Sequence, residues 1–174
     1  ARLDLQEITE KLGVSIIPVR ESIHKLAAEG LVQIQPRRGA YVTELSFDEL
    51  QEIYLVRETL EEMALRAAVP KFSTQVIERL DQLMQEDKEA VAAQDLERVL
   101  QLGKTFHFTI YQASGLSILL DIISSLNYRS RLYQRLYIYL PEGLADHIAA
   151  HRRIYVACKK GDVEEACQAL CDHI

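Results

Sequence analysis

The stretch LGVSIIPVRESIHKLAAEGLVQIQPRRGAYV, residues 12–42, decides the fold of the N-terminal part of this chain. Ser15 stands where the N-cap of a helix is expected, and Pro18 falls in the first turn, where its missing N–H costs little. Three apolar residues then repeat at helical spacing before Gly30, namely Val19, Ile23 and Leu26. The pattern predicts a helix between Ser15 and Gly30.

The sequence on either side of this helix predicts the elements around it. A shorter apolar stripe precedes it and ends at Gly13, which predicts a first helix; its members are Leu5, Ile8 and Leu12. After Gly30, LVQIQP alternates apolar and polar residues, RRG supplies a basic turn, and AYVTEL resumes a strand-like pattern. Helix, turn, helix and hairpin together predict a winged helix-turn-helix over residues 1–45.

A winged helix lays its second helix in the major groove of DNA, while the tip of its hairpin touches the phosphate backbone or the minor groove. Double-stranded DNA is therefore the expected partner. We expect contacts from the start of the second helix and from the hairpin turn: Ser15, Ile16, Arg20, Arg37, Arg38 and Gly39. Isolated arginines are most often solvated surface charges, but these positions face the duplex in a winged helix.

The charge of the chain is unevenly spread. The net charge is −6, which argues against indiscriminate binding of nucleic acid. Residues 1–43 carry six Lys or Arg against five Asp or Glu, whereas the remaining residues carry fourteen against twenty-one. Any contact with DNA is therefore expected in the N-terminal quarter.

Residues 46–174 show helical periodicity and no further convincing strand. Ser46 and Glu49 have the spacing of a capping box, and a helix should run from there to Pro70. Further helices are expected after Ser73, over about 95–113, 117–139 and 144–160, and from Asp162 onward. The chain is thus predicted to be mostly α, with a winged helix-turn-helix followed by an all-α antiparallel bundle of about six helices.

Composition excludes several classes of protein. Apolar runs are far shorter than the roughly 20 residues that cross a bilayer, and no signal peptide begins the chain, so a cytoplasmic protein with no membrane partner is expected. Three cysteines are an odd number, which is not a disulfide framework. Cys167 and Cys171 could share a metal at i and i+4, but no further ligands stand at a familiar zinc spacing.

Three of the five histidines lie in apolar helical stretches: His107, His151 and His173. Each alone would be a hydrogen-bonded core residue, but imidazoles from separate helices of one bundle also hold Zn, Ni or Fe-class ions. His147 precedes His151 by four residues, yet Ile148 stands where the helical metalloprotease motif has Glu, so we expect His147 to be exposed near a helix start. No phosphate loop, nucleophile elbow or Cys-x-x-Cys pair is present, and nothing predicts an enzyme.

Two arginines of the helical part are candidate ligands for an anionic effector, Arg57 and Arg129. Arg57 and Glu61 stand at i and i+4, a spacing that also favours a structural ion pair. Arg129, within SLNYRSRLYQRL, could point inward, where a guanidinium binds a carboxylate through two hydrogen bonds.

Over essentially its whole length the sequence resembles the GntR family of transcription regulators, in its FadR subfamily. The recognition helix and wing carry this match through Pro-Val-Arg-Glu at 18–21 and Arg-Gly-Ala at 38–40. The rest resembles the all-helical FCD effector domain through Arg57-x-x-x-Glu61, Phe106-His107 followed by Ala113-Ser114-Gly115, His151-Arg152-x-Ile154, and Asp172-His173. The resemblance also implies a helix before Arg2, so we expect a longer natural chain.

The resemblance implies a divalent metal held by one Asp and three His, with the metal helping to bind a small carboxylate effector. The histidines match His107, His151 and His173, but the position of the Asp, four residues before the first of them, is Gly103 here. We therefore expect Zn or Ni at a three-histidine site of reduced affinity, because an anionic ligand is lost.

Two further positions depart from the family pattern. Ile16 and Ile17 stand where arginine and threonine are common, which should weaken hydrogen-bond readout of guanine and favour contact with a thymine methyl group. Leu116 stands after Ala-Ser-Gly, where the family often has asparagine.

The expected function is that of a homodimeric repressor whose residues 46–174 bind a small organic acid and mediate dimerisation. Effector binding would change the spacing or orientation of the two winged helices, and so the affinity for a palindromic operator. Three alternatives stay open: a metal-free ligand sensor, a regulator that senses the metal itself, and a metal-dependent enzyme.

Overall fold

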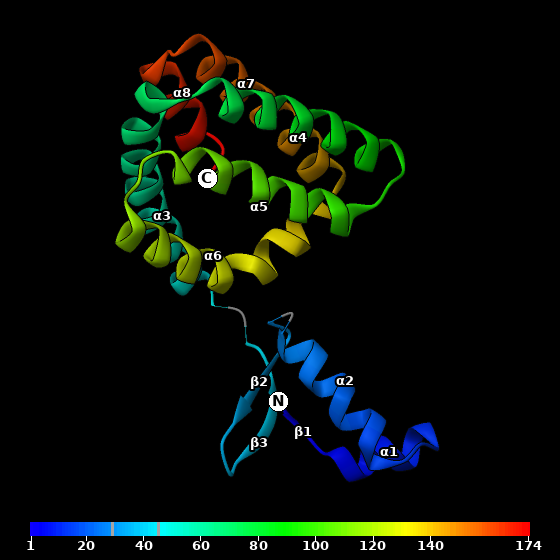
Figure 1. The fold of residues 1–174 in the computed structure, drawn as a ribbon. Coiled ribbons are helices and arrows are strands. Elements are labelled where there is room, and N and C mark those ends of the chain that lie inside the picture. The colour runs from blue at the N-terminus through cyan, green and yellow to red at the C-terminus, as the bar shows by residue number, and fades with distance from the viewer. Residues whose placement is uncertain (29, 45) are drawn as a thin grey trace.

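The computed structural model describes residues 1–28, 30–44 and 46–174 (Figure 1). Its N-terminal part contains β1 (Arg2–Leu3), α1 (Leu5–Leu12), α2 (Ile16–Ala28), β2 (Val32–Gln35) and β3 (Gly39–Val42). The strands form an antiparallel sheet in the order β1-β3-β2. This order of elements confirms the predicted winged helix-turn-helix. β1 spans only two residues, too few for an alternating pattern to reveal it.

Local chemistry sets the ends of α1, and a small core holds α2 on the sheet. The Asp4 carboxylate accepts hydrogen bonds from two backbone N–H groups in the first turn of α1. The helix ends at Gly13, whose φ of 64° is a conformation that favours glycine. The side chains buried between α2 and the sheet are Val19, Ile23, Val32 and Ala40. The apolar stripe predicted for the second helix therefore faces this core.

The C-terminal part is all helical over its described residues. It contains α3 (Phe47–Ala68), the 3-10 turn η1 (Val69–Lys71), α4 (Thr74–Ala92), α5 (Leu96–Gln112), α6 (Ser117–Ile138), α7 (Pro141–Lys160) and α8 (Val163–Cys171). These six α-helices confirm the predicted bundle. The predicted start of α7 near residue 144 is wrong: the helix begins at Pro141, because a proline in the first helical position loses no hydrogen bond.

Side-chain caps begin several of these helices. The Glu49 N–H donates to Ser46 Oγ across 3.2 Å at the start of α3, and the Glu165 N–H donates to Asp162 Oδ1 across 3.1 Å at the start of α8. Both caps lie where the sequence predicts them. Because a cap fixes where a helix begins, it also fixes which of its positions face the core.

The helices pack around one core, with α4 against α5, α7 against α8, and α3 against both α6 and α8 (Figure 1). Fully buried side chains come from most of these helices, among them Leu65, Leu80, Ile110, Ile154 and Leu170. Cys158 and Cys167 are free thiols buried in the same core. None of the described helices combines the length and the apolarity needed to cross a lipid bilayer.

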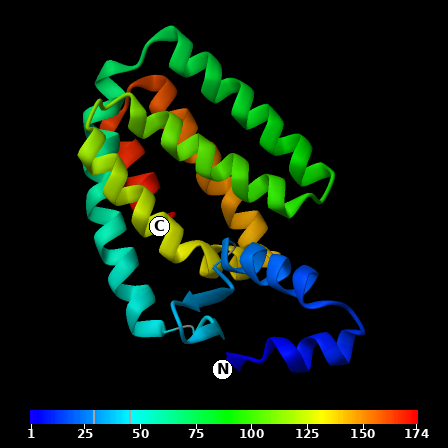
Figure 2. The same cartoon turned by 60° about the horizontal axis from the view of Figure 1, so that its bottom comes forward.

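α6 is hydrogen-bonded to the N-terminal part and to the residue that begins the C-terminal part. The Tyr133 hydroxyl donates to the Ser46 carbonyl across 3.0 Å, just before α3. The Arg131 guanidinium donates to the Ala28 carbonyl across 3.2 Å, so it satisfies a carbonyl at the C-terminal end of α2. Figure 2 shows this end of α2 beside α6. The helix that carries the predicted DNA contacts is thus connected directly to the bundle.

Candidate functional site

Four imidazoles meet inside the helical part. His107 comes from α5, His147 and His151 come from α7, and His173 follows α8. The ring centroid of His151 lies 4.8 Å from that of His107, 4.0 Å from that of His147 and 4.9 Å from that of His173. The fold therefore brings together the three histidines that the sequence singles out, and adds a fourth.

Gly103 leaves room for this cluster. It lies one helical turn before His107 on α5, and a Cβ atom at this position would lie 2.9 Å from the Cε1 atoms of both His147 and His151. Carbon atoms that are not bonded to each other normally stay about 3.5–4.0 Å apart. The α7 imidazoles can approach α5 only because position 103 has no side chain.

A chain of hydrogen bonds orients His107. The Tyr111 hydroxyl donates to Glu61 Oε2 across 2.6 Å, and its oxygen lies 3.3 Å from His107 Nδ1. Because the hydroxyl has one proton and gives it to the carboxylate, the Nδ1–H of His107 must donate to the tyrosine oxygen. The neutral ring then keeps its lone pair on Nε2, the nitrogen that faces His151.

Burial keeps three of these rings neutral. Desolvation lowers the pKa of His107 and His151 well below the usual value for histidine, and the neighbouring histidines lower the pKa of both further. Desolvation likewise lowers the pKa of His173 to about 4. Neutral imidazole is the form that binds metal ions, so these three rings have lone pairs to offer at pH 7.

The nitrogen positions fit one small cation. The ligand atoms of His107, His151 and His173 all lie within 4.8 Å of one another. Two imidazole nitrogens that each lie about 2.0–2.1 Å from a tetrahedral zinc ion are roughly 3.3 Å apart. The Nε2 atoms of His107 and His151 are 3.0 Å apart, close to that spacing. The donor set therefore fits a divalent ion of the zinc class.

The prediction that His147 is exposed is wrong. Its side chain is 8% exposed, and its Nε2 lies 3.1 Å from Oδ1 of Asp87 on α4. α7 begins earlier than predicted, so His147 is well inside the helix and reaches the space beside Gly103. No spacing along the sequence could reveal this contact, because its two partners are 60 residues apart.

A cavity of about 700 Å³ opens beside the histidines. This volume lies within the range of about 300–1,000 Å³ that is typical of small-molecule sites. Helices α3, α5, α6 and α7 contribute to its wall, and all four clustered histidines line it. Its other polar or charged lining residues include Tyr54, Arg57, Lys104, Asn127 and Gln134.

Arg57 lines this cavity, and two buried side chains hold its guanidinium in place. Its Nε donates to Glu61 Oε1 across 2.7 Å, and its Nη1 donates to Ser130 Oγ across 3.3 Å. Both members of the ion pair are buried, which confirms the structural pair predicted from their i, i+4 spacing. The guanidinium is therefore a fixed positive group in the cavity wall.

Arg129 does not point inward as predicted. Its Nη2 donates to Glu49 Oε1 across 2.7 Å, and its side chain is 54% exposed. On α6 the cavity is lined by Asn127, Tyr133, Gln134, Tyr137 and Ile138. Arg129 is not among these residues; it meets the first turn of α3, which supplies its carboxylate partner.

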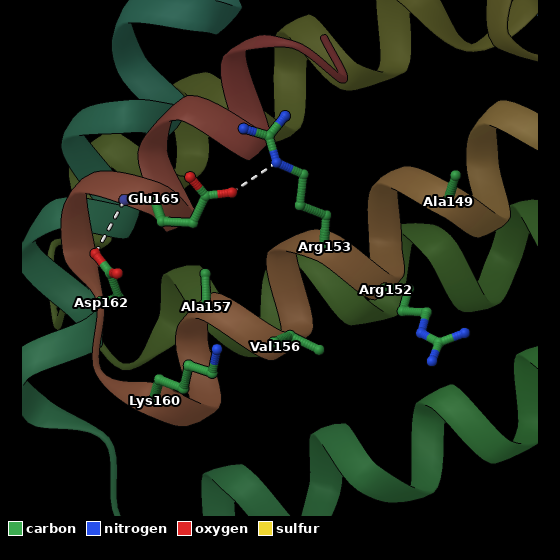
Figure 3. Close-up of a pocket in the computed structure, with 8 residues that line it drawn as sticks. All are labelled: Ala149, Arg152, Arg153, Val156, Ala157, Lys160, Asp162 and Glu165. Carbon is green, nitrogen blue, oxygen red and sulfur yellow. Dashed lines mark hydrogen bonds and ion pairs between the residues drawn. The ribbon is translucent and has the colours of Figure 1, made fainter.

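A second depression, of about 460 Å³, lies on the surface along α7 and the start of α8 (Figure 3). Arg153 on its wall forms an ion pair with Glu165, 2.7 Å away. None of the described residues that line this depression is a histidine or a tyrosine. The candidate site is therefore the cavity at the histidines.

The residues predicted to contact DNA are all exposed: Ser15, Ile16, Arg20, Arg37, Arg38 and Gly39. The turn of the wing is closed by a hydrogen bond of 3.0 Å from the Arg38 N–H to the Gln35 carbonyl. Pro36 and Arg37 are its central residues, and Arg37 has a φ of 63°, as the third residue of a type II turn requires. The turn thus holds an arginine side chain at the tip of the hairpin.

Comparison with known proteins decides the family. A family profile described as "FCD domain" matches residues 52–174, and one described as "Bacterial regulatory proteins, gntR family" matches residues 1–42. The chain belongs to the GntR family. This GntR-family chain is accordingly a DNA-binding transcription regulator and not an enzyme, as the sequence predicts.

Relatives of this GntR-family chain share its architecture along almost its whole length. It is 30% identical to the HTH-type transcriptional regulator McbR of Escherichia coli strain K12, over 94% of this chain and 75% of that protein. It is 27% identical to the HTH-type transcriptional repressor RspR of the same strain, over 99% of this chain and 75% of that protein. A solved structure of E. coli McbR/YncC matches this chain with a TM-score of 0.74 and 30% sequence identity. The match covers 99% of this chain and 82% of the McbR/YncC chain.

Replacing Gly103 with alanine should destabilise the metal-free protein. Alanine favours a helix by about 0.8–1.0 kcal/mol over glycine, but overpacking a core costs about 1–3 kcal/mol. The added Cβ would press against the imidazoles of His147 and His151. We expect the free energy of unfolding in urea to fall.

The same substitution in a His147→Ala background is the control, because one of the two crowded rings is then absent. Gly103→Ala should cost less there than in the parent chain. An equal gain of stability in both backgrounds would show that α5 and α7 are not in close contact at this position.

Proposed function

We propose that this regulator is a repressor that binds a palindromic operator as a homodimer and responds to a small carboxylic acid. In this proposal residues 1–45 contact DNA and residues 46–174 bind the acid beside a divalent ion, Zn or Ni. The observation that carries it is the meeting of three neutral imidazoles in the wall of a cavity, those of His107, His151 and His173. Repression is supported by RspR, a relative described as a repressor.

The chemistry of the cavity supports an acidic effector. His107, His151 and His173 would hold the ion, which would offer an open coordination position to a carboxylate oxygen. Arg57 and Lys104 line the same cavity and are positive partners for that carboxylate. Because Arg57 is anchored by Glu61, it is already in place before any ligand arrives.

α6 supports a link between the cavity and DNA. Its residues Asn127, Tyr133 and Gln134 line the cavity. Tyr133 also binds the backbone at Ser46, and Arg131 binds the last carbonyl of α2. A ligand that shifts α6 would therefore move the end of the recognition helix. Only a ligand with different affinities for the two arrangements can shift their populations.

Exposed apolar side chains on α3 support dimerisation. Leu55 and Met63 are 66% and 52% exposed, and Val56 between them is 39% exposed. Apolar groups gathered on one face of a soluble protein commonly mark an interaction surface. We propose that a second copy of the chain covers this face of the bundle.

Two alternatives remain within the same fold. In a metal-free sensor, the imidazoles and Arg57 would hold the acid by hydrogen bonds alone. In a metal sensor, the ion itself would be the effector. Each makes a different prediction for metal content and for the response of operator binding.

His107→Ala should abolish metal binding. The parent protein, purified without a chelator or an affinity tag, should contain stoichiometric zinc or nickel by elemental analysis. The alanine variant should contain little, because it loses one of three neutral nitrogen ligands. His24→Ala, which removes an exposed imidazole of α2, is the control and should retain the metal. A parent protein that stays free of metal after zinc is supplied would leave only the metal-free sensor.

Small mono- and dicarboxylic acids should change the affinity for operator DNA. At fixed zinc concentration, we expect one of them to shift the affinity for a duplex taken from the DNA flanking the gene by about 5- to 150-fold, the usual range of allosteric coupling. Fluorescence anisotropy measures this shift. A response to zinc alone would identify a metal sensor, and no response to either would contradict the allosteric proposal.

Arg37→Gly should weaken DNA binding without destabilising the winged helix. Glycine adopts the φ of 63° at this position without the strain of about 1–2 kcal/mol that an L side chain bears. If Arg37 contacts a phosphate, binding to a mixed-sequence duplex weakens and the slope of log K against log salt falls by about 1. Lys11→Ala, on exposed α1, is the matched control and should keep the parental slope. An unchanged slope for the glycine variant would remove Arg37 from the interface.

A further inference from the structure

A second group of potential metal ligands shares a histidine with the first. The ligand atoms of Asp87, His147 and His151 lie within 4.8 Å of one another, as do those of His107, His151 and His173. The ring centroids of His147 and His151 are 4.0 Å apart. The two groups are separate but adjoin each other at His151, and this raises the question of what His147 does there.

His147 occupies space that position 103 leaves free. Its Cε1 lies 2.9 Å from where the Cβ of a larger residue at position 103 would be. An aspartate at this position, which the family resemblance leads us to expect, would compete with the imidazole for the same space. This chain thus lacks the aspartate ligand at position 103 and has the imidazole of His147 in the same space.

Asp87 decides which nitrogen of His147 carries the proton. The Asp87 Oδ1 lies 3.1 Å from His147 Nε2, and the two side chains are only 7% and 8% exposed. A carboxylate accepts hydrogen bonds, so Nε2–H of His147 donates and the lone pair of the ring stays on Nδ1. Histidines that bind metals commonly have their other nitrogen bonded to a carboxylate, which fixes the tautomer and makes the ligand more basic.

We propose that His147 is a fourth protein ligand of the ion held by His107, His151 and His173, and that Asp87 is its positioning residue. This inference rests on the proposed metal site and extends it: with four protein ligands, the ion would bind the carboxylate oxygen as a fifth ligand and not at the fourth position of a tetrahedral site. In relatives an aspartate would bind the ion directly. In this chain the negative charge of Asp87 would act on the ion through the imidazole of His147. Four nitrogen donors select Zn, Ni or Cu over Mg, Ca and Mn, which prefer oxygen ligands.

The test measures metal affinity and ligand geometry in the full chain. Metal-free protein is titrated with Zn²⁺ against a chromophoric chelator, and separately with Co²⁺, whose visible absorption bands report the number and arrangement of its ligands. Asp87→Asn should weaken Zn²⁺ binding by about 10- to 100-fold, the usual effect of losing a hydrogen-bond partner of a ligand. His147→Ala should weaken it more and should change the Co²⁺ bands.

Two further variants separate a missing ligand from a disturbed fold. His24→Ala should match the parent protein in both titrations, because His24 is exposed on α2. The double variant Gly103→Asp with His147→Ala places a carboxylate in the space that the ring vacates. It should bind Zn²⁺ more tightly than His147→Ala alone, because a ligand has been restored.

The outcomes distinguish a failure of the fourth ligand from a failure of the proposed three-histidine metal site. If the parent protein binds neither Zn²⁺ nor Co²⁺, the three-histidine site is wrong, and so is the proposed fourth ligand. If the parent binds both ions and His147→Ala binds them equally tightly with unchanged Co²⁺ bands, only the fourth ligand is overturned. Loss of affinity in His147→Ala with recovery in the double variant supports it.

Discussion

The candidate site depends on one missing side chain, at Gly103. A Cβ there would meet two imidazole carbons at 2.9 Å, so α7 can bring His147 and His151 against α5 only because the residue is glycine. A glycine inside a helix is unfavourable by roughly 0.5–1 kcal/mol relative to alanine. The burial of Leu102 and Phe106 on the same helix offsets this and keeps the segment helical. Local stability is thus lowered at the one position where the cluster needs room.

Two chains of polar groups orient the rings around that point. In the first, Arg57 binds Glu61, which accepts from Tyr111, whose oxygen in turn accepts from His107. In the second, Asp87 accepts from His147. Each chain leads from a buried carboxylate to an imidazole and leaves the opposite nitrogen of that ring with its lone pair. Among the described residues, every fully buried side-chain nitrogen or oxygen has a hydrogen-bond partner, as a buried polar network requires.

The same bundle helix that borders the cavity also reaches the DNA-binding part. α6 lines the cavity and its Arg131 binds the end of α2, while Tyr133, which also lines the cavity, binds the segment before α3. A hydrogen bond to a carbonyl at the end of a helix depends on the position of that helix end, so it transmits a displacement better than a loose apolar contact would. This gives the proposed response to an effector a physical route through named residues.

The sequence by itself determined the helices, the hairpin and the three principal histidines. Helical spacing, the caps at Ser46 and Asp162, and the basic turn at Arg37 and Arg38 are local features, and local features set where a helix or hairpin forms. Only the tertiary structure decided which side chains meet. It turned Arg129 outward to Glu49, buried His147 against Asp87, and placed Gly103 at their crossing. These outcomes depend on contacts between residues far apart in the chain, and no periodicity along one helix contains that information.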